Sequence, residues 1–316
     1  MSRYLSGRFI QSVLVLAIMS FAIYGLIGLM PGDPVDLMIS ADPKMTSQDA
    51  ERLRELYGLD KPITERYLNW LGAAIQGDFG YSRLHAAPVL SVLWEALGNT
   101  IKLLGLAFIL SISLALPLGI FAATRARSKS DYAINFFAFT GISIPPFWLA
   151  LLLIIGFSVI WPILPANAVP ADSDAGWLAT LQHLILPIAT IVIASMGGHT
   201  RYMRASMIET LRQDYIRTAY AKGLPMRKVV LKHALRNALI PVVTIIALDF
   251  GSLFSGALIT ETIFSYPGMG KLIFDSIMGN DFNLALVALL FATALTLTGN
   301  LLADLVYAKL DPRIRY

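Results

Sequence analysis

Residues 101–123 read IKLLGLAFILSISLALPLGIFAA, and this apolar stretch decides the fold class of the chain. Its only charged residue, Lys102, stands at its start. A helix needs about 18–20 predominantly apolar residues to cross the hydrocarbon core of a bilayer. A buried helix of a soluble protein rarely stays apolar on every side over that length. The stretch therefore predicts a membrane-spanning helix.

Five further apolar runs share this character, at residues 9–30, 134–160, 181–199, 238–263 and 284–308. The chain of 316 residues is 56% hydrophobic and 15% charged, whereas a soluble domain is about a quarter charged. We therefore expect an all-α integral membrane protein with six transmembrane helices. The first run follows Arg3 and Arg8 as in a signal peptide, but its length and the lack of a small-residue cleavage site indicate an uncleaved span. The absence of Cys excludes disulfides and thiolate chemistry.

The basic residues predict the orientation of these spans. Seventeen of the 25 Lys and Arg residues fall in the two termini and in the loops after the second and fourth spans. Because cytoplasmic loops carry the excess of Lys and Arg, both termini are expected in the cytoplasm. The opposite side holds residues 31–98, with predicted helices at 47–57 and 63–75. The predicted division is an N-terminal span (1–30), an extracytoplasmic helical segment (31–98) and a membrane core (99–316).

One loop is far more basic than the others. Residues 215–241 read YIRTAYAKGLPMRKVVLKHALRNALIP, with six Lys or Arg and no acidic residue. A short helix at residues 215–222, a turn at Gly223 and a second helix after Pro225 are predicted, because Gly adopts positive φ at little cost. A basic helix of this kind can lie on anionic lipid headgroups. The sharp break at Gly223 favours docking into a groove of another protein instead.

The same loop resembles a known family. Residues 217–223 (RTAYAKG) and 233–238 (HALRNA) resemble the cytoplasmic loop of permeases in the dipeptide/oligopeptide/nickel branch of binding-protein-dependent ABC importers. Arg217 replaces the Glu of the wider family's motif, as in that branch. Four other stretches resemble the branch in the same order, at residues 30–34, 67–89, 256–270 and 311–315. The likeness covers the whole chain, and the large segment at 31–98 resembles the first permease subunit.

The resemblance implies a type I importer fold in a bacterial inner membrane and a set of partners. These are a second homologous permease subunit forming a heterodimer, two cytoplasmic ATPase subunits, an extracytoplasmic substrate-binding protein and the lipid bilayer, with no nucleic acid. ATP and Mg would bind to the ATPase subunits, so this chain is expected to hold no cofactor and to be no enzyme. Coupling helices are implied at residues 214–237, with the ATPase contacts at Arg217, Thr218, Ala219, Lys222, Gly223 and Leu224. The chain's own residues agree, since residues 268–272 (GMGKL) lack the first Gly and final hydroxyl of a phosphate-binding loop.

Candidate pathway residues follow from the polar groups within the apolar runs. Asp249 is the clear case, because ionisable residues inside spans are rare and face a cavity or a partner. Three interpretations stay open: a pathway residue that meets a cationic group of the substrate, a hydrogen bond between subunits, or a locally satisfied protonated acid. Ser252 and Ser255 follow on nearby turns, and Glu261 is expected to pair with the outer segment. The four His residues share no metal-ligand spacing, so no metal site is expected.

The substrate is the least determined feature of the sequence. Dipeptides or oligopeptides are the default of the resembled branch, and nickel complexes, glutathione, opines or sugars are the alternatives. A second class, an ion-coupled secondary transporter, would usually show two repeated halves, which the sequence lacks. A third class, an intramembrane enzyme, would need a nucleophile–base pair or a metal cluster, and neither is found.

Overall fold

The computed structural model describes residues 2–29, 48, 51, 52, 55, 61–170, 172, 176–252 and 257–310. At residues 2–5, 250–252, 303, 304 and 306–310 the description covers the backbone alone. The predicted helix at 47–57 lies largely outside these residues. The other predicted outer helix, at 63–75, is confirmed with the same bounds as α4 (Ile63–Ile75). It starts after Pro62, and Gly77, with φ +87°, follows its end.

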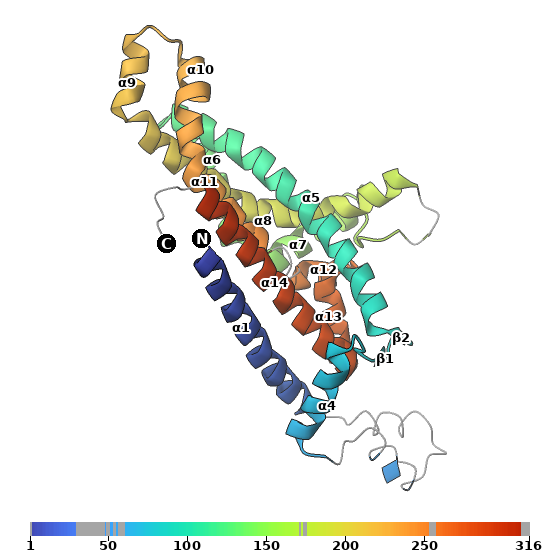
Figure 1. The fold of residues 1–316 in the computed structure, drawn as a ribbon. Coiled ribbons are helices and arrows are strands. Elements are labelled where there is room, and N and C mark those ends of the chain that lie inside the picture. Colours follow the sequence, from blue (N-terminus) through green and yellow to red (C-terminus); the bar gives the residue numbers. More distant parts are fainter. Residues whose placement is uncertain are drawn as a thin grey trace. The chain divides into compact units, whose positions relative to one another are not determined.

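The described chain is almost entirely helical (Figure 1). A short antiparallel pair, β1 (Tyr81–Ser82) and β2 (Ala87–Pro88), pairs Tyr81 with Pro88. The helices are α1 (Ser2–Gly28), α4, α5 (Val89–Thr124), α6 (Lys129–Ser143), α7 (Pro146–Ile154), the π-helix η1 (Ile155–Ile160), α8 (Trp177–Leu211), α9 (Asp214–Ala221), α10 (Met226–Lys228), the π-helix η2 (Val229–Ala234), α11 (Leu235–Ser252), α12 (Leu258–Ile263), α13 (Met269–Met278) and α14 (Phe282–Leu310).

Five helical segments of the described chain are long and apolar enough to cross a membrane. They are Ser6–Gly28, Val89–Thr124, Trp177–Leu211, Met226–Asp249 and Phe282–Leu302. A sixth is obtained when the bent pair of Lys129–Ser143 and Pro146–Ile160 is counted as one span. The predicted all-α membrane fold is therefore confirmed.

Two spans differ in detail from the predicted ones. The third was expected as one apolar run at residues 134–160, whereas the structure divides it into Lys129–Ser143 and Pro146–Ile160, which are bent by 101°. The fifth was expected at residues 238–263, whereas the apolar helical segment begins at Met226 and α12 is a separate helix. In both cases the apolar run locates the membrane segment, and proline or the packing of neighbouring helices sets where the helix starts and turns.

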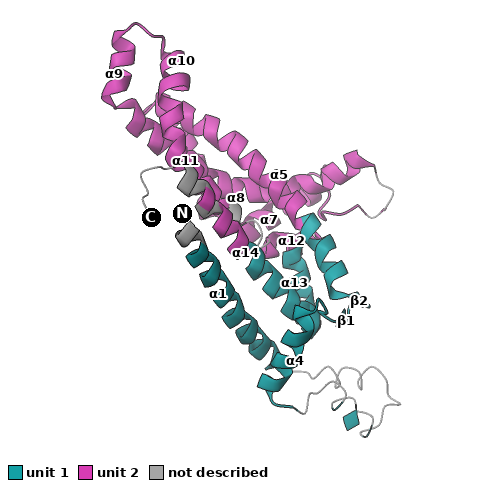
Figure 2. Cartoon of the chain, in the orientation of Figure 1, with its two compact units in different colours: residues 1–99, 267–295 teal, residues 100–266, 296–316 magenta. Residues whose placement is uncertain are grey.

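The chain forms two compact units (Figure 2). Unit 1 contains residues 1–99 and 267–295, and unit 2 contains residues 100–266 and 296–316. The sequence-based division placed residues 267–295 with the core at 99–316, so the two groupings differ for this segment. α5 and α14 each contribute residues to both units.

Unit 1 is held by apolar contacts between the first part of α5, α13 and α14. Leu93 of α5, Met269 of α13 and Leu284 of α14 are fully buried in one cluster. Asp281 fixes the start of α14, because its carboxylate accepts hydrogen bonds from Leu284 N at 3.2 Å and from Ser82 Oγ at 2.6 Å.

Unit 2 is organised around α8, which packs closely against α6. A Cβ added at Gly197 of α8 would lie 2.3 Å from the carbonyl oxygen of Ala138, and one at Gly141 of α6 would lie 2.5 Å from that of Ile193. Small residues of this kind allow helix backbones to approach each other inside a membrane. The α6–α8 crossing therefore depends on these two glycines.

Candidate functional site

Residues 214–234 fold into a helical hairpin, here called the basic hairpin. Its first arm is α9, and its second arm is α10 followed by η2. The turn lies at Gly223, whose φ is +74°. Gly223 N donates to Tyr220 O at 2.9 Å and Leu224 N donates to Ala219 O at 3.4 Å, which closes the end of α9. An added Cβ at Gly223 would meet nothing within 4 Å, so the backbone conformation, and not space, favours glycine here.

The inner face of the basic hairpin is a small apolar core. Ile216 and Ala219 of α9 are buried together with Val229 of η2 and with Met203 and Met207 of α8. Ala219, which the sequence analysis placed among the ATPase contacts, is thus only 6% exposed and holds α9 against its neighbours. The hairpin is fixed to α8 by this core, so a force on its tip would pass to α8.

The outer face carries the remaining predicted contact residues. Arg217, Thr218, Lys222 and Gly223 are exposed, and Leu224 is partly buried against the apolar core. Arg217 Nη1 lies 3.5 Å from Asp214 Oδ1, but both side chains are more than three-quarters exposed, so this ion pair contributes little to stability. Figure 1 shows α9 and α10 joined by the exposed turn at one tip of unit 2. The tip therefore carries exposed cations.

The second arm differs from the regular helix that the sequence predicts. Residues Val229–Ala234 form a π-helix, which α-helical spacing does not anticipate. Lys228, Lys232 and Arg236 are nevertheless all exposed.

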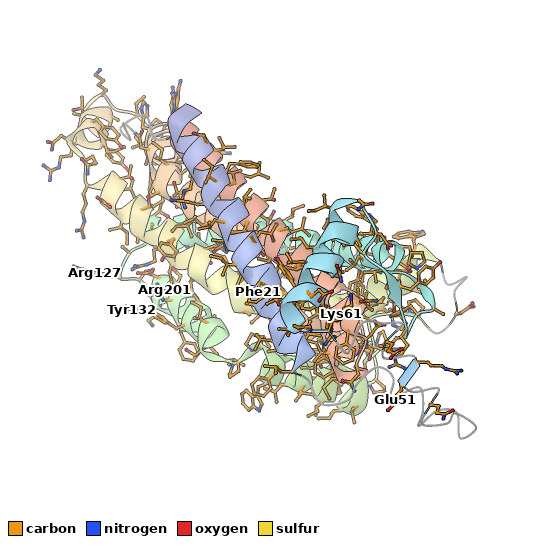
Figure 3. All side chains as sticks on the ribbon, turned by 60° about the horizontal axis from the view of Figure 1, so that its bottom comes forward. Phe21, Glu51, Lys61, Arg127, Tyr132 and Arg201 are labelled. Atoms are coloured by element: carbon orange, nitrogen blue, oxygen red, sulfur yellow. The ribbon has the colours of Figure 1, made fainter. Side chains whose placement is uncertain are left out.

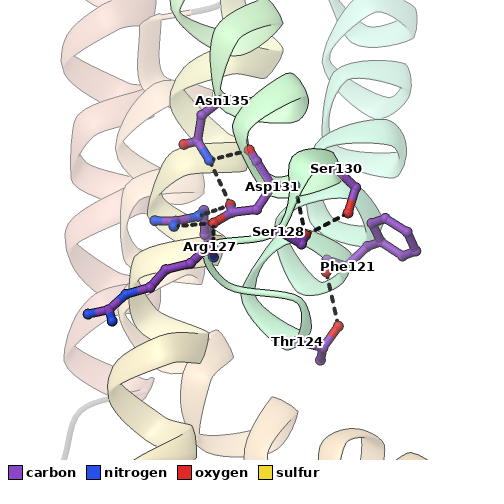
Figure 4. Close-up of polar contacts among 8 residues, drawn as sticks. Phe121, Thr124, Arg127, Ser128, Ser130, Asp131 and Asn135 are labelled. Carbon is purple, nitrogen blue, oxygen red and sulfur yellow. Dashed lines mark hydrogen bonds and ion pairs between the residues drawn. The ribbon is translucent and has the colours of Figure 1, made fainter.

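A buried ionic network lies in unit 2 where the α5–α6 loop meets α8 (Figure 4). Asp131 is 1% exposed and accepts a bidentate contact from Arg204, with Nε to Oδ1 at 2.6 Å and Nη2 to Oδ2 at 2.7 Å. Arg127 N donates to Oδ2 at 2.8 Å, and Asn135 Nδ2 donates to Oδ1 at 2.8 Å. Ser128 caps α6 by accepting from Asp131 N. Because the buried charge of Asp131 is paired with Arg204, the network fixes this loop on α8.

Asp249, the strongest pathway candidate, lies beside a histidine. His199 Nε2 of α8 is 2.9 Å from Asp249 Oδ2 of α11, within ion-pair distance but without a regular hydrogen bond. The His199 side chain is 5% exposed, whereas the Asp249 side chain is 51% exposed. The sequence alone offers no reason to connect His199 with Asp249, because the two residues are 50 positions apart on different helices.

The other pathway candidates have different surroundings. Glu261 is fully buried in α12 and accepts a hydrogen bond from Thr100 Oγ1 of α5 at 2.8 Å. Burial raises the pKa of nearby Tyr266 to about 12, and the negative charge of Glu261 adds to this shift. Ser252 is the last residue of α11, and only its backbone is described. Ser255 lies outside the described residues. In the described part of the chain, no three His, Asp or Glu side chains are grouped to hold a metal ion.

Together, the membrane helices and the exposed basic hairpin fit the class of a multi-pass membrane permease of the type I importer fold. Comparison with protein families agrees. Residues 115–316 match the model of the binding-protein-dependent transport system inner membrane component, and residues 1–115 match the model of its N-terminal part. The chain therefore belongs to this family and is an inner-membrane protein.

Curated relatives cover the chain from end to end. The oligopeptide transport system permease protein AppB of Bacillus subtilis is 40% identical over 318 residues, which cover 100% of both chains. A putative peptide permease protein of Brucella ovis is 38% identical over 100% of this chain and 99% of its own. The dipeptide transport system permease protein DppB of Escherichia coli K12 is 33% identical over 98% of this chain and 97% of its own.

Proposed function

We propose that this chain is the permease subunit of an ATP-driven importer of dipeptides or oligopeptides. The single observation that carries the proposal is the exposed cationic tip of the basic hairpin, anchored on α8 by a buried apolar core. A surface of this form suits insertion into a groove of a second protein. The names of the full-length relatives support peptides as the substrate class.

The partners follow from this function. A second permease chain would complete the pathway as a heterodimer, two cytoplasmic ATPase subunits would bind ATP and Mg, and an extracytoplasmic binding protein would deliver the peptide. ATP-driven closure of the ATPase pair would move α9, and the apolar core of the hairpin would transmit this movement to α8 as a rigid body. Both termini would lie in the cytoplasm, as the distribution of basic residues favours.

The decisive experiment is purification of the tagged chain with its partners, followed by reconstitution and uptake of labelled dipeptide. Arg217→Glu should leave the chain in the membrane and reduce the retained ATPase about tenfold, since a charge reversal at a docking contact opposes association. Lys129→Glu is the matched control, because Lys129 is an exposed cation at the start of α6 and belongs neither to the hairpin nor to its apolar core. Equal ATPase retention by wild type and Arg217→Glu would remove the coupling role of this surface.

The uptake assay also separates the rival substrates and mechanisms. Competition by an unlabelled peptide supports the proposal, whereas competition by nickel complexes, glutathione, opines or sugars alone would assign a different substrate of the same branch. Uptake that persists without ATP and stops when an uncoupler collapses the ion gradient would indicate a secondary transporter.

Asp249 is the proposed pathway residue for the cationic amino terminus of the substrate. Its carboxylate is half-exposed in unit 2, and the buried His199 beside it favours a defined position of the carboxylate. Asp249→Asn should reduce uptake of peptides with a free amino terminus more than uptake of amino-acetylated peptides. An equal effect on both would favour the alternative role of Asp249 in contacting the second permease.

A further inference from the structure

A hollow of about 410 Å³ lies on unit 2 between α6 and α8, apart from the basic hairpin and from Asp249. Its lining combines cations, aromatic rings and an amide. The main contributors are Asn135 and Phe139 of α6 and Gly198, Arg201, Tyr202 and Arg204 of α8.

One wall of the hollow is held rigidly and retains unused donors. Arg204 uses Nε and Nη2 on the buried Asp131, and Asn135 Nδ2 donates to Asp131 O at 2.7 Å and to Oδ1 at 2.8 Å. A guanidinium carries five N–H donors, so three of those of Arg204 are left for another acceptor. The wall is therefore ready to bind an oxygen-rich anion without rearrangement.

Arg201, about one helical turn before Arg204 on α8, supplies a positive charge that no described acid neutralises. The guanidinium carbon of Arg201 lies 4.1 Å from the centre of the Phe139 ring. Among the described residues, no carboxylate pairs with Arg201. Since Asp131 balances Arg204, the lining of the hollow carries one net positive charge, that of Arg201. Guanidinium groups bind phosphate oxygens with charge-assisted hydrogen bonds.

The position of the hollow indicates where the anion comes from. The apolar run of α8 ends at His199, so Arg201 and Arg204 follow it by about one helical turn, where lipid headgroups begin. Exposed aromatic side chains surround this level on α6 and α8, as in the aromatic belt of a membrane protein: Tyr132, Phe136, Phe137 and Tyr202. Figure 3 labels Tyr132 and Arg201 together with Arg127, a further cation of the α5–α6 loop.

We propose that this hollow binds the phosphate headgroup of an anionic phospholipid, with Arg201 and Arg204 as the phosphate ligands and Phe139 as the platform that orients Arg201. The acyl chains would lie along the exposed apolar face of α6, where Phe136 and Phe137 are 65% and 71% exposed. This site goes beyond the proposed transport function and does not depend on the identity of the substrate.

The test is a thermal-stability titration of the detergent-purified full chain with short-chain phosphatidylglycerol, short-chain phosphatidylcholine and inorganic phosphate in separate arms. Phosphatidylglycerol should stabilise the wild type, while the other two should not at equal concentration. Arg201→Gln should weaken the apparent affinity for phosphatidylglycerol about five- to tenfold, which is the effect of one cation near a lipid phosphate. Phe139→Leu should weaken it in the same direction.

Arg125→Gln is the matched control. Arg125 also lies over an aromatic ring, with its guanidinium carbon 4.2 Å from the centre of Phe121, but it does not line the hollow. The proposal is overturned if Arg125→Gln and Arg201→Gln weaken the apparent affinity for phosphatidylglycerol equally. It is also overturned if inorganic phosphate stabilises the wild-type protein as much as the lipid does. It is also overturned if crosslinking at position 201 in the assembled importer captures the second permease chain instead of lipid.

Discussion

Replacing Gly197 by Ala should destabilise the protein, whereas the same replacement at the adjacent Gly198 should not. A Cβ at Gly197 would lie 2.3 Å from Ala138 O and 3.0 Å from Ile142 Cγ1, inside the crossing of α6 and α8. A Cβ at Gly198 would meet nothing within 4 Å. Two neighbouring residues of one helix therefore offer opposite environments for the same added methyl group.

The magnitude follows from two opposing effects. Gly→Ala in a helix interior gains about 0.5–1 kcal/mol through backbone entropy. A contact of 2.3 Å with a carbonyl oxygen forces the two backbones apart by about 1 Å, and overpacking of this kind costs about 1–3 kcal/mol. We expect Gly197→Ala to lose about 1–2 kcal/mol of unfolding free energy and Gly198→Ala to gain about 0.5 kcal/mol.

The assay is unfolding by SDS in mixed micelles, followed by far-ultraviolet circular dichroism on the purified chain. Gly141→Ala provides a second arm, because its Cβ would lie 2.5 Å from Ile193 O on the other side of the same crossing. The reasoning is refuted if Gly197→Ala is as stable as Gly198→Ala, since the close approach of α6 and α8 would then not exist.

Three further predictions concern other parts of unit 2. Arg204→Ala should lower the free energy of unfolding by about 3–5 kcal/mol in the same SDS assay, because the buried Asp131 would be left unpaired. The double variant with Asp131→Asn should recover part of this loss, and no recovery would argue against an ionic cause. Thr100→Val should lower the free energy of unfolding by about 1–2 kcal/mol, since it removes a hydrogen-bond donor to the buried Glu261. An unchanged midpoint of SDS unfolding would count against that hydrogen bond. The Gly223→Asp variant should stay in the membrane but show no uptake in reconstituted vesicles. The reason is that it places a side chain at a position with φ +74° and a negative charge on the cationic tip. Normal uptake would contradict the coupling role of the hairpin.

The sequence was most informative where structure depends on local pattern. The apolar runs located the membrane helices, since bilayer thickness alone sets their length. Helix α4 was predicted with its observed bounds because Pro62 and Gly77 flank one amphipathic segment. The basic hairpin followed from Gly223 and Pro225, two residues with strong backbone preferences.

Long-range contacts could not be predicted in the same way. Arg204 reaches Asp131 from 73 positions along the chain, and only the packing of α6 on α8 brings them together. The local part of that network did have a signal, because Ser128 and Asp131 have the spacing of a helix cap. The pairing of His199 with Asp249 similarly depends on α8 lying against α11. Apolar periodicity carries no information about these partners.

The 101° bend between α6 and α7 has a consequence for hydration. A helix start normally leaves four N–H groups without partners, and dehydrating each of them inside a bilayer costs several kcal/mol. Pro145, the N-cap of α7, and Pro146, its first residue, both have no N–H, so two of these four groups are absent, and the regular helix bonds begin with Leu149 N donating to Pro145 O at 3.0 Å. Of the first four positions, Phe147 and Trp148 keep an N–H for which the helix itself supplies no acceptor. The double proline therefore acts by removing donors that water would otherwise have to satisfy, so that a chain can turn sharply in an apolar medium.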